Sequence, residues 1–420
     1  MGTFPQKISS NGRFFTDDQG SPFFWLGDTA WPLFTQYSRP EAEAYLENRA
    51  AKGFTVIQGV LAWFGGPNPD PSDVSPNWKG AYPWVNKDPA HPNPDFFDHV
   101  DGLLGVAQDL RLTLAILPTW GNFVTDLGLF TVDSAWHYGQ WLGQRYRDRP
   151  NLVWINGGDC LPHGFEAVFD ALGEGLRAGD GGRHLITYHP CALHSSSQFF
   201  NDRAWLDFHM IQCWTDWHKI YDSVVSDNLT TPSRPVVLGE GAYENGPEYA
   251  RGPITPLIVR RQAWWSFMAG GYHTYGQNSL WRAEPGWTAT FDTPGAEQMG
   301  VFRRIVGSLP WWQRLPDQAI LEEGASGGET LNAAVRDMDG SWLMVYLSSR
   351  CHVLVRLEKL CSSRAIATWI NPATGEEKAA GDFQTYTMPG VRQVRTTNYQ
   401  WFSTPDCWED AVLLLRGSQD

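Results

Sequence analysis

Several classes of protein are excluded by what this sequence lacks. Its six cysteines form no C-x-x-C pair, which argues against a zinc ribbon or a redox motif. Lysine and arginine form no run, and the formal net charge of the 420 residues is −14, so we expect neither nucleic acid nor an anionic membrane as a partner. No stretch of about 20 apolar residues occurs, so we expect no membrane span.

The first residues, Met-Gly-Thr-Phe-Pro-Gln-Lys, contain none of the apolar stretch that a signal peptide needs. We therefore expect no signal peptide on this sequence. The native compartment stays open between the cytoplasm and a secreted protein that has been trimmed. The oligomeric state also stays open, because nothing in the sequence bears on it.

Aromatic residues are abundant, with 22 Trp, 22 Phe and 14 Tyr. Most of these rings are expected to fill a large core, since the chain is 42% hydrophobic. Several tryptophans instead fall in expected loops, where a sugar ring can stack on an indole face. These are Trp63, Trp78, Trp84, Trp281 and Trp287.

Apolar strands alternate with amphipathic helices from the N-terminus to about residue 310. After a hairpin over residues 7–22, eight strands are expected to end near residues 28, 58, 120, 159, 189, 212, 240 and 275. Such alternation predicts a parallel sheet, and eight units predict a (β/α)₈ TIM barrel. A doubly wound sheet is the weaker alternative, because G-D-T-A-W-P after the first strand is not a phosphate-binding G-x-G-x-x-G.

The pattern changes after Pro310, where helical spacing disappears and short alternating strands follow one another. Strands are expected over residues 331–336, 342–347, 353–357, 365–370, 383–388 and 411–415. This spacing predicts a small β-sandwich. We place the catalytic barrel at residues 1–312 and the β-sandwich at 313–420.

Two carboxylates stand at predicted strand ends, each directly after glycine. Asp159 closes N-L-V-W-I-N-G-G-D, and Glu240 closes P-V-V-L-G-E, on the fourth and seventh strands. The carboxyl ends of the strands build the active face of such a barrel. A protonated acid and an ionised carboxylate are what cleavage of a glycosidic bond requires. The sequence therefore predicts a glycoside hydrolase with Asp159 and Glu240 as its catalytic pair, although each acid alone could instead cap a helix or pair with arginine.

Further side chains near the strand ends are expected to bind the sugar. Asp28 has two open interpretations, either binding sugar hydroxyls or holding the first loop as a buried structural acid. The histidines also have the alternative of being satisfied core residues. The full predicted set is Asp28, Trp31, Gln58, Trp63, Trp120, Asn156, His189, His209, Trp214, Tyr243, His273, Tyr275 and Trp281.

Two other classes of barrel were weighed against a glycosidase. A metal-dependent hydrolase would favour an H-x-H motif on the first strand, where this chain has G-D-T, so we expect no metal and no organic cofactor. A non-catalytic carbohydrate-binding barrel would keep the aromatic residues without needing both acids. Either a carbohydrate or a glycoside is therefore the expected partner.

Four motifs together resemble the apiosidase-like proteins of glycoside hydrolase family 140. The resemblance covers roughly residues 8 to 310, and the C-terminal part is similar to the β-sandwich, named for collagen binding, that usually follows in that family. The motifs are W-L-G-D-T-A-W at 25–31, W-I-N-G-G-D at 154–159, L-G-E-G-A-Y-E at 238–244 and G-G-Y-H-T-Y-G-Q-N-S-L-W at 270–281.

The resemblance implies a (β/α)₈ barrel that removes terminal apiose from plant polysaccharides or glycosides. It places the family's acid/base on Asp159 and its nucleophile on Glu240, and it implies a retaining, exo-acting enzyme. The sequence departs from the wider clan of retaining barrel glycosidases, which usually has Asn-Glu where N-G-G-D stands at residues 156–159. The same mechanism acting on another sugar remains the alternative.

Overall fold

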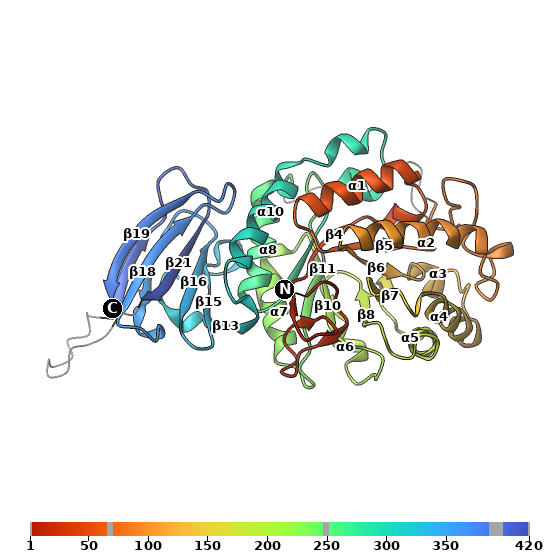
Figure 1. The fold of residues 1–420 in the computed structure, drawn as a ribbon, viewed down its shortest axis with the longest axis horizontal. Helices are drawn as coiled ribbons and strands as arrows, with labels where there is room; N and C mark the ends of the chain where they lie inside the picture. The colour runs from red at the N-terminus through yellow and green to blue at the C-terminus, as the bar shows by residue number, and fades with distance from the viewer. Residues whose placement is uncertain (1, 65–69, 247–251, 386–397, 419–420) are drawn as a thin grey trace.

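The computed structural model describes residues 2–64, 70–246, 252–385 and 398–418. Figure 1 shows a barrel wrapped by helices, with an all-β unit, drawn in blue, lying against one side of it. This arrangement confirms the predicted TIM barrel and β-sandwich. Among the described helices, none is both long enough and apolar enough to cross a membrane.

Eight parallel strands form the barrel wall. They run β8-β7-β6-β5-β4-β12-β11-β10 in the sheet, and the short β9 (His194–Ser195) adds to the edge of β10 in the antiparallel sense. The parallel strands are β4 (Leu26–Thr29), β5 (Val56–Val60), β6 (Thr113–Leu117), β7 (Leu152–Cys160), β8 (Ile186–Pro190), β10 (His209–Trp214), β11 (Val236–Gly241) and β12 (Tyr272–Tyr275).

Helices cover the outside of the strands, as βα alternation requires. The first begins after a capping box formed by Ser38 and Glu41, with Pro40 in its first turn. The helices are α1 (Arg39–Ala51), α2 (Pro94–Asp109), α3 (Asn122–Thr125), α4 (Val132–Tyr146), α5 (Glu166–Asp180), α6 (Ser197–Phe200), α7 (Ile220–Asn228), α8 (Pro256–Met268), α9 (Asn278–Arg282) and α10 (Pro294–Gly307).

Three short strands at the N-terminus, β1 (Lys7–Ile8), β2 (Phe15–Thr16) and β3 (Pro22–Phe23), close the barrel end opposite the strand tips. The buried Phe15 ring packs on Trp25, Phe208 and Tyr272, with ring centroids 5.1–5.5 Å away. The first barrel strand starts at Leu26, because Phe23 belongs to this N-terminal sheet.

The C-terminal unit contains two antiparallel sheets, ordered β13-β15-β16-β21-β18-β19 and β14-β17-β20. Three short strands, β13, β14 and β20, lie outside the predicted ranges, and the boundary at residues 312 and 313 stays a prediction. Strand β19 ends at Gln384, so it lies earlier than the strand predicted at 383–388, of which residues 386–388 are outside the described residues. The strands are β13 (Arg314–Pro316), β14 (Leu321–Glu323), β15 (Ala333–Asp337), β16 (Trp342–Leu347), β17 (His352–Arg356), β18 (Arg364–Ile370), β19 (Glu377–Gln384), β20 (Tyr399–Ser403) and β21 (Ala411–Ser418).

The sandwich is joined to the barrel by a buried seam along α8. Arg260 forms an ion pair with Asp410 across it, 2.7 Å from Nη2 to Oδ1, and both side chains are nearly inaccessible to water. The Trp264 ring stacks on Tyr346, whose hydroxyl donates to Asp410 at 2.9 Å. Charged and aromatic groups buried together in this way favour one fixed placement of the sandwich on the barrel.

Candidate active site

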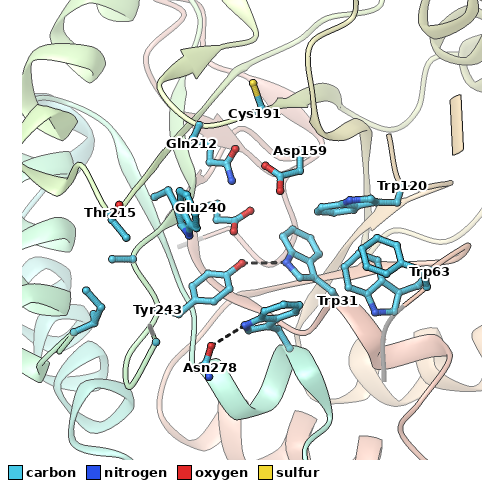
Figure 2. Close-up of a pocket in the computed structure, with 17 residues that line it drawn as sticks. Trp31, Trp63, Trp120, Asp159, Cys191, Gln212, Thr215, Glu240, Tyr243 and Asn278 are labelled. Atoms are coloured by element: carbon cyan, nitrogen blue, oxygen red, sulfur yellow. Dashed lines mark hydrogen bonds between the residues drawn. The ribbon is translucent and has the colours of Figure 1, made fainter. Parts of the chain in front are cut away.

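A pocket of about 400 Å³ opens at the carboxyl ends of the barrel strands and contains both predicted acids. Asp159 reaches it from the end of β7, the fourth barrel strand, and Glu240 from β11, the seventh. Figure 2 shows the two carboxylates facing the same space. The volume lies within the range of small-ligand sites in proteins.

The two glycines before Asp159 bend the end of β7 toward the pocket. Gly157 and Gly158 have φ angles of 82° and 117°, a region that glycine adopts readily. A Cβ atom on Gly157 would lie 2.5 Å from the Tyr188 ring, and one on Gly158 would lie 2.7 Å from the Trp120 ring. Register with β8 shifts between Gly157 and Cys160, and Asp159 lies inside this irregularity with a φ of 52°. The N-G-G-D motif thus builds a bulge that aims its acid at the cavity.

The surroundings of Asp159 raise the pKa of its carboxyl group. Burial in the cavity wall, and then the negative charge of Glu240, raise the pKa of Asp159 to about 6. His189 and a hydrogen bond donated by the Gln212 amide oppose this shift without cancelling it. An acid with such a pKa can donate a proton near neutral pH.

Glu240 lies deeper, with 7% of its surface exposed. The Tyr243 hydroxyl hydrogen-bonds to its carboxylate, and Trp31 Nε1 donates to the Tyr243 oxygen at 3.0 Å. Burial, and then the Glu240 charge, raise the pKa of Tyr243 well above its usual value, so the phenol stays protonated and can donate. Neither a lysine nor an arginine is among the described residues that line the pocket.

His189 stands between the two acids at the end of β8. Its Nδ1 accepts a 3.4 Å hydrogen bond from the backbone N–H of Asp159. Its Nε2 lies 3.2 Å from Glu240 Oε2. The imidazole is fully buried, so the predicted contact with sugar is replaced by contacts with both carboxylate-bearing residues.

Aromatic rings form one wall of the pocket. The Trp63 ring stacks on Phe64 at 4.4 Å and meets Trp120 edge-on at 4.8 Å. Trp120 meets Trp31 in turn, with their centroids 5.1 Å apart. The residues predicted to bind sugar that line this pocket are Trp31, Trp63, Trp120, Trp214, Tyr243 and Trp281.

Asp28 lies away from the pocket as a fully buried structural acid, the second of its two interpretations. Its carboxylate pairs with Arg49 and accepts from the Tyr45 hydroxyl at 2.6 Å and from the Thr29 backbone N–H at 2.8 Å. Burial raises the pKa of Asp28, while the Arg49 charge and the Tyr45 hydrogen bond oppose the shift. The contacts leave no sugar-binding role for this carboxylate.

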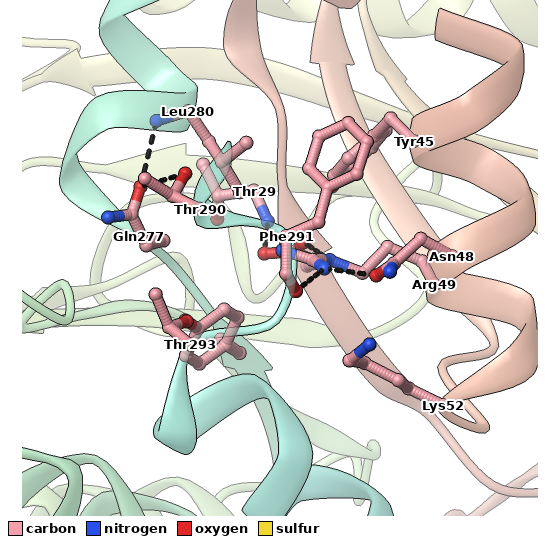
Figure 3. A network of polar contacts seen from close by, with 12 residues as sticks. Thr29, Tyr45, Asn48, Arg49, Lys52, Gln277, Leu280, Thr290, Phe291 and Thr293 are labelled. Atoms are coloured by element: carbon pink, nitrogen blue, oxygen red, sulfur yellow. Dashed lines mark hydrogen bonds and ion pairs between the residues drawn. The ribbon is translucent and has the colours of Figure 1, made fainter. Parts of the chain in front are cut away.

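Arg49 joins this structural acid to the loop before α10. Its Nη1 donates 2.7 Å hydrogen bonds to the Phe291 carbonyl and to Asn48 Oδ1. Figure 3 shows Arg49 reaching from α1 to that loop. The cluster of Asp28, Arg49 and Tyr45 thus ties the first barrel strand to its helix and to a distant segment.

Gln58 and Asn156 are also buried away from the pocket. Gln58 Nε2 donates to the Gly239 carbonyl at 3.0 Å inside the barrel. Asn156 Nδ2 donates to the Phe169 carbonyl at 2.7 Å, so it anchors α5 to β7 where a contact with a sugar hydroxyl was expected. Both amides are used to satisfy backbone groups that would otherwise be buried without partners.

The other predicted polar contacts also lie outside the pocket lining. His209 pairs with Asn201 at 3.0 Å, and burial lowers its pKa to about 4. His273 is buried within the barrel, where burial lowers its pKa to about 3. The Tyr275 hydroxyl donates to Glu244 at 2.5 Å, so it stabilises the segment after β11.

Several lining residues were missed by sequence reasoning. Gln212 is the most informative of them, because it is the register partner of Glu240 on the neighbouring strand and contacts Asp159. The position of Gln212 at a predicted strand end could have identified it from the sequence. The position of Asn278 in the motif at 270–281 could have done the same. The missed residues are Phe64, Cys191, Ala192, Gln212, Thr215, Ala242, Gly246, Ile254 and Asn278.

No metal or organic cofactor was expected from the sequence. Among the described residues, no group of three or more His, Cys, Asp and Glu side chains is arranged to hold a metal ion. The pocket lining itself contributes two carboxylates with unlike surroundings.

Comparison with known proteins gives matches over nearly the whole chain. The family described as "Apiosidase-like, catalytic domain" matches residues 9–313, and "Putative collagen-binding domain of a collagenase" matches residues 315–416. A search of curated proteins found no match.

Solved structures of glycoside hydrolases are similar to the chain. One described as "Glycoside hydrolase" has 27% identity and a TM-score of 0.87, over 99% of this chain and 97% of its own. A family 5 glycoside hydrolase from Bacteroides vulgatus ATCC 8482 has 26% identity and a TM-score of 0.87, over 99% and 94%.

A GH27 β-L-arabinopyranosidase from Geobacillus stearothermophilus, at 12% identity and a TM-score of 0.56 over 94% and 97% of the two chains, shares the fold alone. The catalytic-domain match spans most of the chain, and the two structures of higher identity are glycoside hydrolases. The protein with this pocket is therefore a glycosidase that belongs to the apiosidase-like family.

Proposed function

We propose that this glycosidase is a retaining, exo-acting enzyme that removes terminal apiosyl, or similar pentosyl, residues from plant glycosides or polysaccharides. The observation that carries the proposal is the meeting of Asp159 and Glu240 in one pocket, with different surroundings for each carboxyl group. Two carboxyl groups with separated roles are the basis of most glycosidase mechanisms.

In the first step, the Glu240 carboxylate attacks the anomeric carbon while the bond to the leaving oxygen breaks. The proton on Asp159 passes to that oxygen, and a covalent glycosyl ester forms on Glu240. In the second step, Asp159 takes a proton from water, and the water oxygen attacks the same carbon. Glu240 leaves as a carboxylate, and Asp159 is protonated again.

The electrostatic contact between the two acids supports retention. Glu240 is close enough to raise the pKa of Asp159, and one imidazole touches both residues. Retaining enzymes place their carboxyl groups about 5–5.5 Å apart, whereas inverting enzymes leave a wider gap for a water molecule. The charge effect shows that the two acids are near one another, and the anomeric form of the first product decides between the two spacings.

The pocket walls support a small, neutral sugar. The aromatic wall of Trp31, Trp63 and Trp120 offers ring faces and edges to the apolar side of a sugar. The described lining carries two acids and neither lysine nor arginine, so a sugar acid would be repelled. Apiose is a neutral pentose, and the apiosidase-like name of the family adds support for it.

Sugar release from a panel of aryl and flavonoid glycosides tests the proposal, with wild type and the Asp159→Asn and Glu240→Gln variants assayed side by side. We expect free apiose from the wild type alone, unaffected by EDTA. Proton NMR of the first product should show the anomer of the substrate. Glu244→Gln is a matched control, because Glu244 lies four residues further on and contacts Tyr275 away from the pocket.

The outcomes separate the parts of the proposal. Release of another pentose or of a hexose keeps the two-acid mechanism and discards apiose. An inverted first product discards the covalent intermediate. Activity lost with EDTA, or retained by Glu240→Gln, contradicts the two-carboxylate mechanism itself.

A further inference from the structure

We propose that His189 is a positioning residue, held in a single orientation with the proton of Nε2 facing Glu240, that orients the Glu240 carboxylate for attack. The inference rests on the proposed function, because it assigns His189 a role through the nucleophile. It differs from the sugar-binding role expected from sequence, since His189 is fully buried and does not line the pocket.

The imidazole plane is fixed by its neighbours. The Trp31 ring meets it edge-on with centroids 5.5 Å apart, and the Trp120 ring lies 5.9 Å away on a tilt of 45°. A ring confined in this way cannot swing out to the substrate, so its two nitrogens keep their present partners. Both indoles also line the pocket, which links the wall of the sugar site to the orientation of His189.

The partner of Nδ1 determines the tautomer. A backbone N–H can only donate, and the Asp159 N–H points at Nδ1 from 3.4 Å. Nδ1 must therefore carry a lone pair, which makes the neutral ring carry its proton on Nε2.

The proton on Nε2 faces the nucleophile. Nε2 lies 3.2 Å from Glu240 Oε2, and neither atom has an aligned hydrogen-bond partner within the described parts of the chain. A loose contact of this kind is common before substrate binds and tightens in the reacting complex. Donation from Nε2 stabilises the ionised form of Glu240, and Tyr243 donates to the same carboxylate.

The titratable groups around the imidazole are few. Asp159 faces it from β7 and Glu240 faces it from β11, while the two indoles carry no charge. His189 therefore connects the acid strand to the nucleophile strand directly. This arrangement couples the backbone of Asp159 to the carboxylate of Glu240 through a single rigid ring.

Two substitutions at His189 test the roles of its two ring nitrogens separately. In His189→Asn, the shorter amide can place an acceptor near Nδ1 and has no atom that reaches Nε2. In His189→Gln, the longer amide can place its N–H near Nε2. We expect His189→Asn to lower kcat on 4-nitrophenyl apiofuranoside by about 10- to 100-fold, with a smaller change in KM, and His189→Gln to restore most of the loss.

The leaving group distinguishes a role through the nucleophile from a role through the acid. The loss in His189→Asn should persist with a 2,4-dinitrophenyl leaving group, which needs no proton from Asp159. Rescue by the better leaving group would overturn the proposal.

A parallel assay of Glu240→Gln keeps the two proposals apart. Full activity in His189→Asn beside an inactive Glu240→Gln overturns the positioning role alone, whereas an active Glu240→Gln overturns both. The wild-type tautomer gives an independent readout that needs neither substrate nor a folded variant. ¹⁵N NMR of histidine-labelled protein should show a proton on Nε2 of His189 and a lone pair on Nδ1, and protonation on Nδ1 would overturn the proposal.

Discussion

Two groups of acids at the barrel strand ends have opposite surroundings. Asp28, at the end of β4, is sealed in the interior with Arg49 and Tyr45. Asp159 and Glu240, at the ends of β7 and β11, share an open pocket and have neither a lysine nor an arginine among its described lining residues. Each of the three acids directly follows a glycine at the end of an apolar strand. The local sequence alone therefore does not distinguish the structural acid from the two in the pocket.

The comparison shows how the surroundings of a strand-end carboxylate differ between a structural acid and a proposed catalytic one. Asp28 is fully buried and pairs with Arg49, so its charge holds α1 to the sheet. Asp159 is exposed to the pocket and has a second carboxylate near it, so that desolvation, and then the Glu240 charge, raise its pKa. Acidity near neutral pH therefore arises where a carboxylate has a like charge beside it and a cavity in front of it.

The largest expected effect is on catalysis. Glu240→Gln removes the attacking carboxylate and should lower kcat by roughly 10³-fold or more, since the nucleophile and the acid/base act as a unit. Circular dichroism and thermal melting should stay close to wild type. Near-normal turnover in this variant would contradict the role given to Glu240.

The next largest effect is on stability, at the other acid. Asp28→Asn leaves Arg49 buried without its counter-charge and should lower the free energy of unfolding by about 3–5 kcal/mol. Urea unfolding measures this directly. Glu43→Gln is the matched control, because the Arg39–Glu43 pair is partly exposed and its loss should cost under about 1 kcal/mol.

A pH profile sharpens the comparison at Asp159. With a pKa of about 6, its proton is present below that pH and is lost above it, so kcat/KM should fall as the pH rises through about 6. The fall should be much weaker with a 2,4-dinitrophenyl substrate, which needs no acid. The same basic limb for both leaving groups would assign the titration to another residue.

The smallest expected effect is at the pocket wall. Trp281→Ala should raise KM by roughly 3- to 10-fold with little change in kcat, because an aromatic contact of about 0.5–1.5 kcal/mol is lost while both acids stay in place. Steady-state kinetics with an aryl glycoside that the wild type cleaves would measure both kcat and KM. A fall in kcat with unchanged KM would instead indicate that Trp281 acts on the transition state.

Sequence reasoning succeeded where a feature is local. Apolar strands alternating with amphipathic helices predicted the eight-stranded barrel. Glycine before Asp159 and Glu240 marked the two strand ends that the structure brings into one pocket. Such features depend on periodicity and on backbone conformation, both of which are visible in neighbouring residues.

Sequence reasoning missed what depends on distant partners. Asn156 and Gln58 stand at strand positions that suit sugar binding, yet their amides are used by the backbone carbonyls of Phe169 and Gly239. Gln212 was left out of the predicted site, although the sheet register places it beside Glu240. Side chains at one barrel position point inward or outward according to register and bulges, which span many residues of sequence.

The sequence by itself determined the barrel, the sandwich and the two acids, because strand periodicity and glycine-acid turns are encoded within a few residues. Only the tertiary structure decided which buried groups each acid meets. Arg49 reaches Asp28 from the following helix, while Glu240 and His189 reach Asp159 from separate strands. The physical reason is that a pKa and a tautomer depend on charges and donors within a few ångströms in space, and folding brings those groups together from distant parts of the chain.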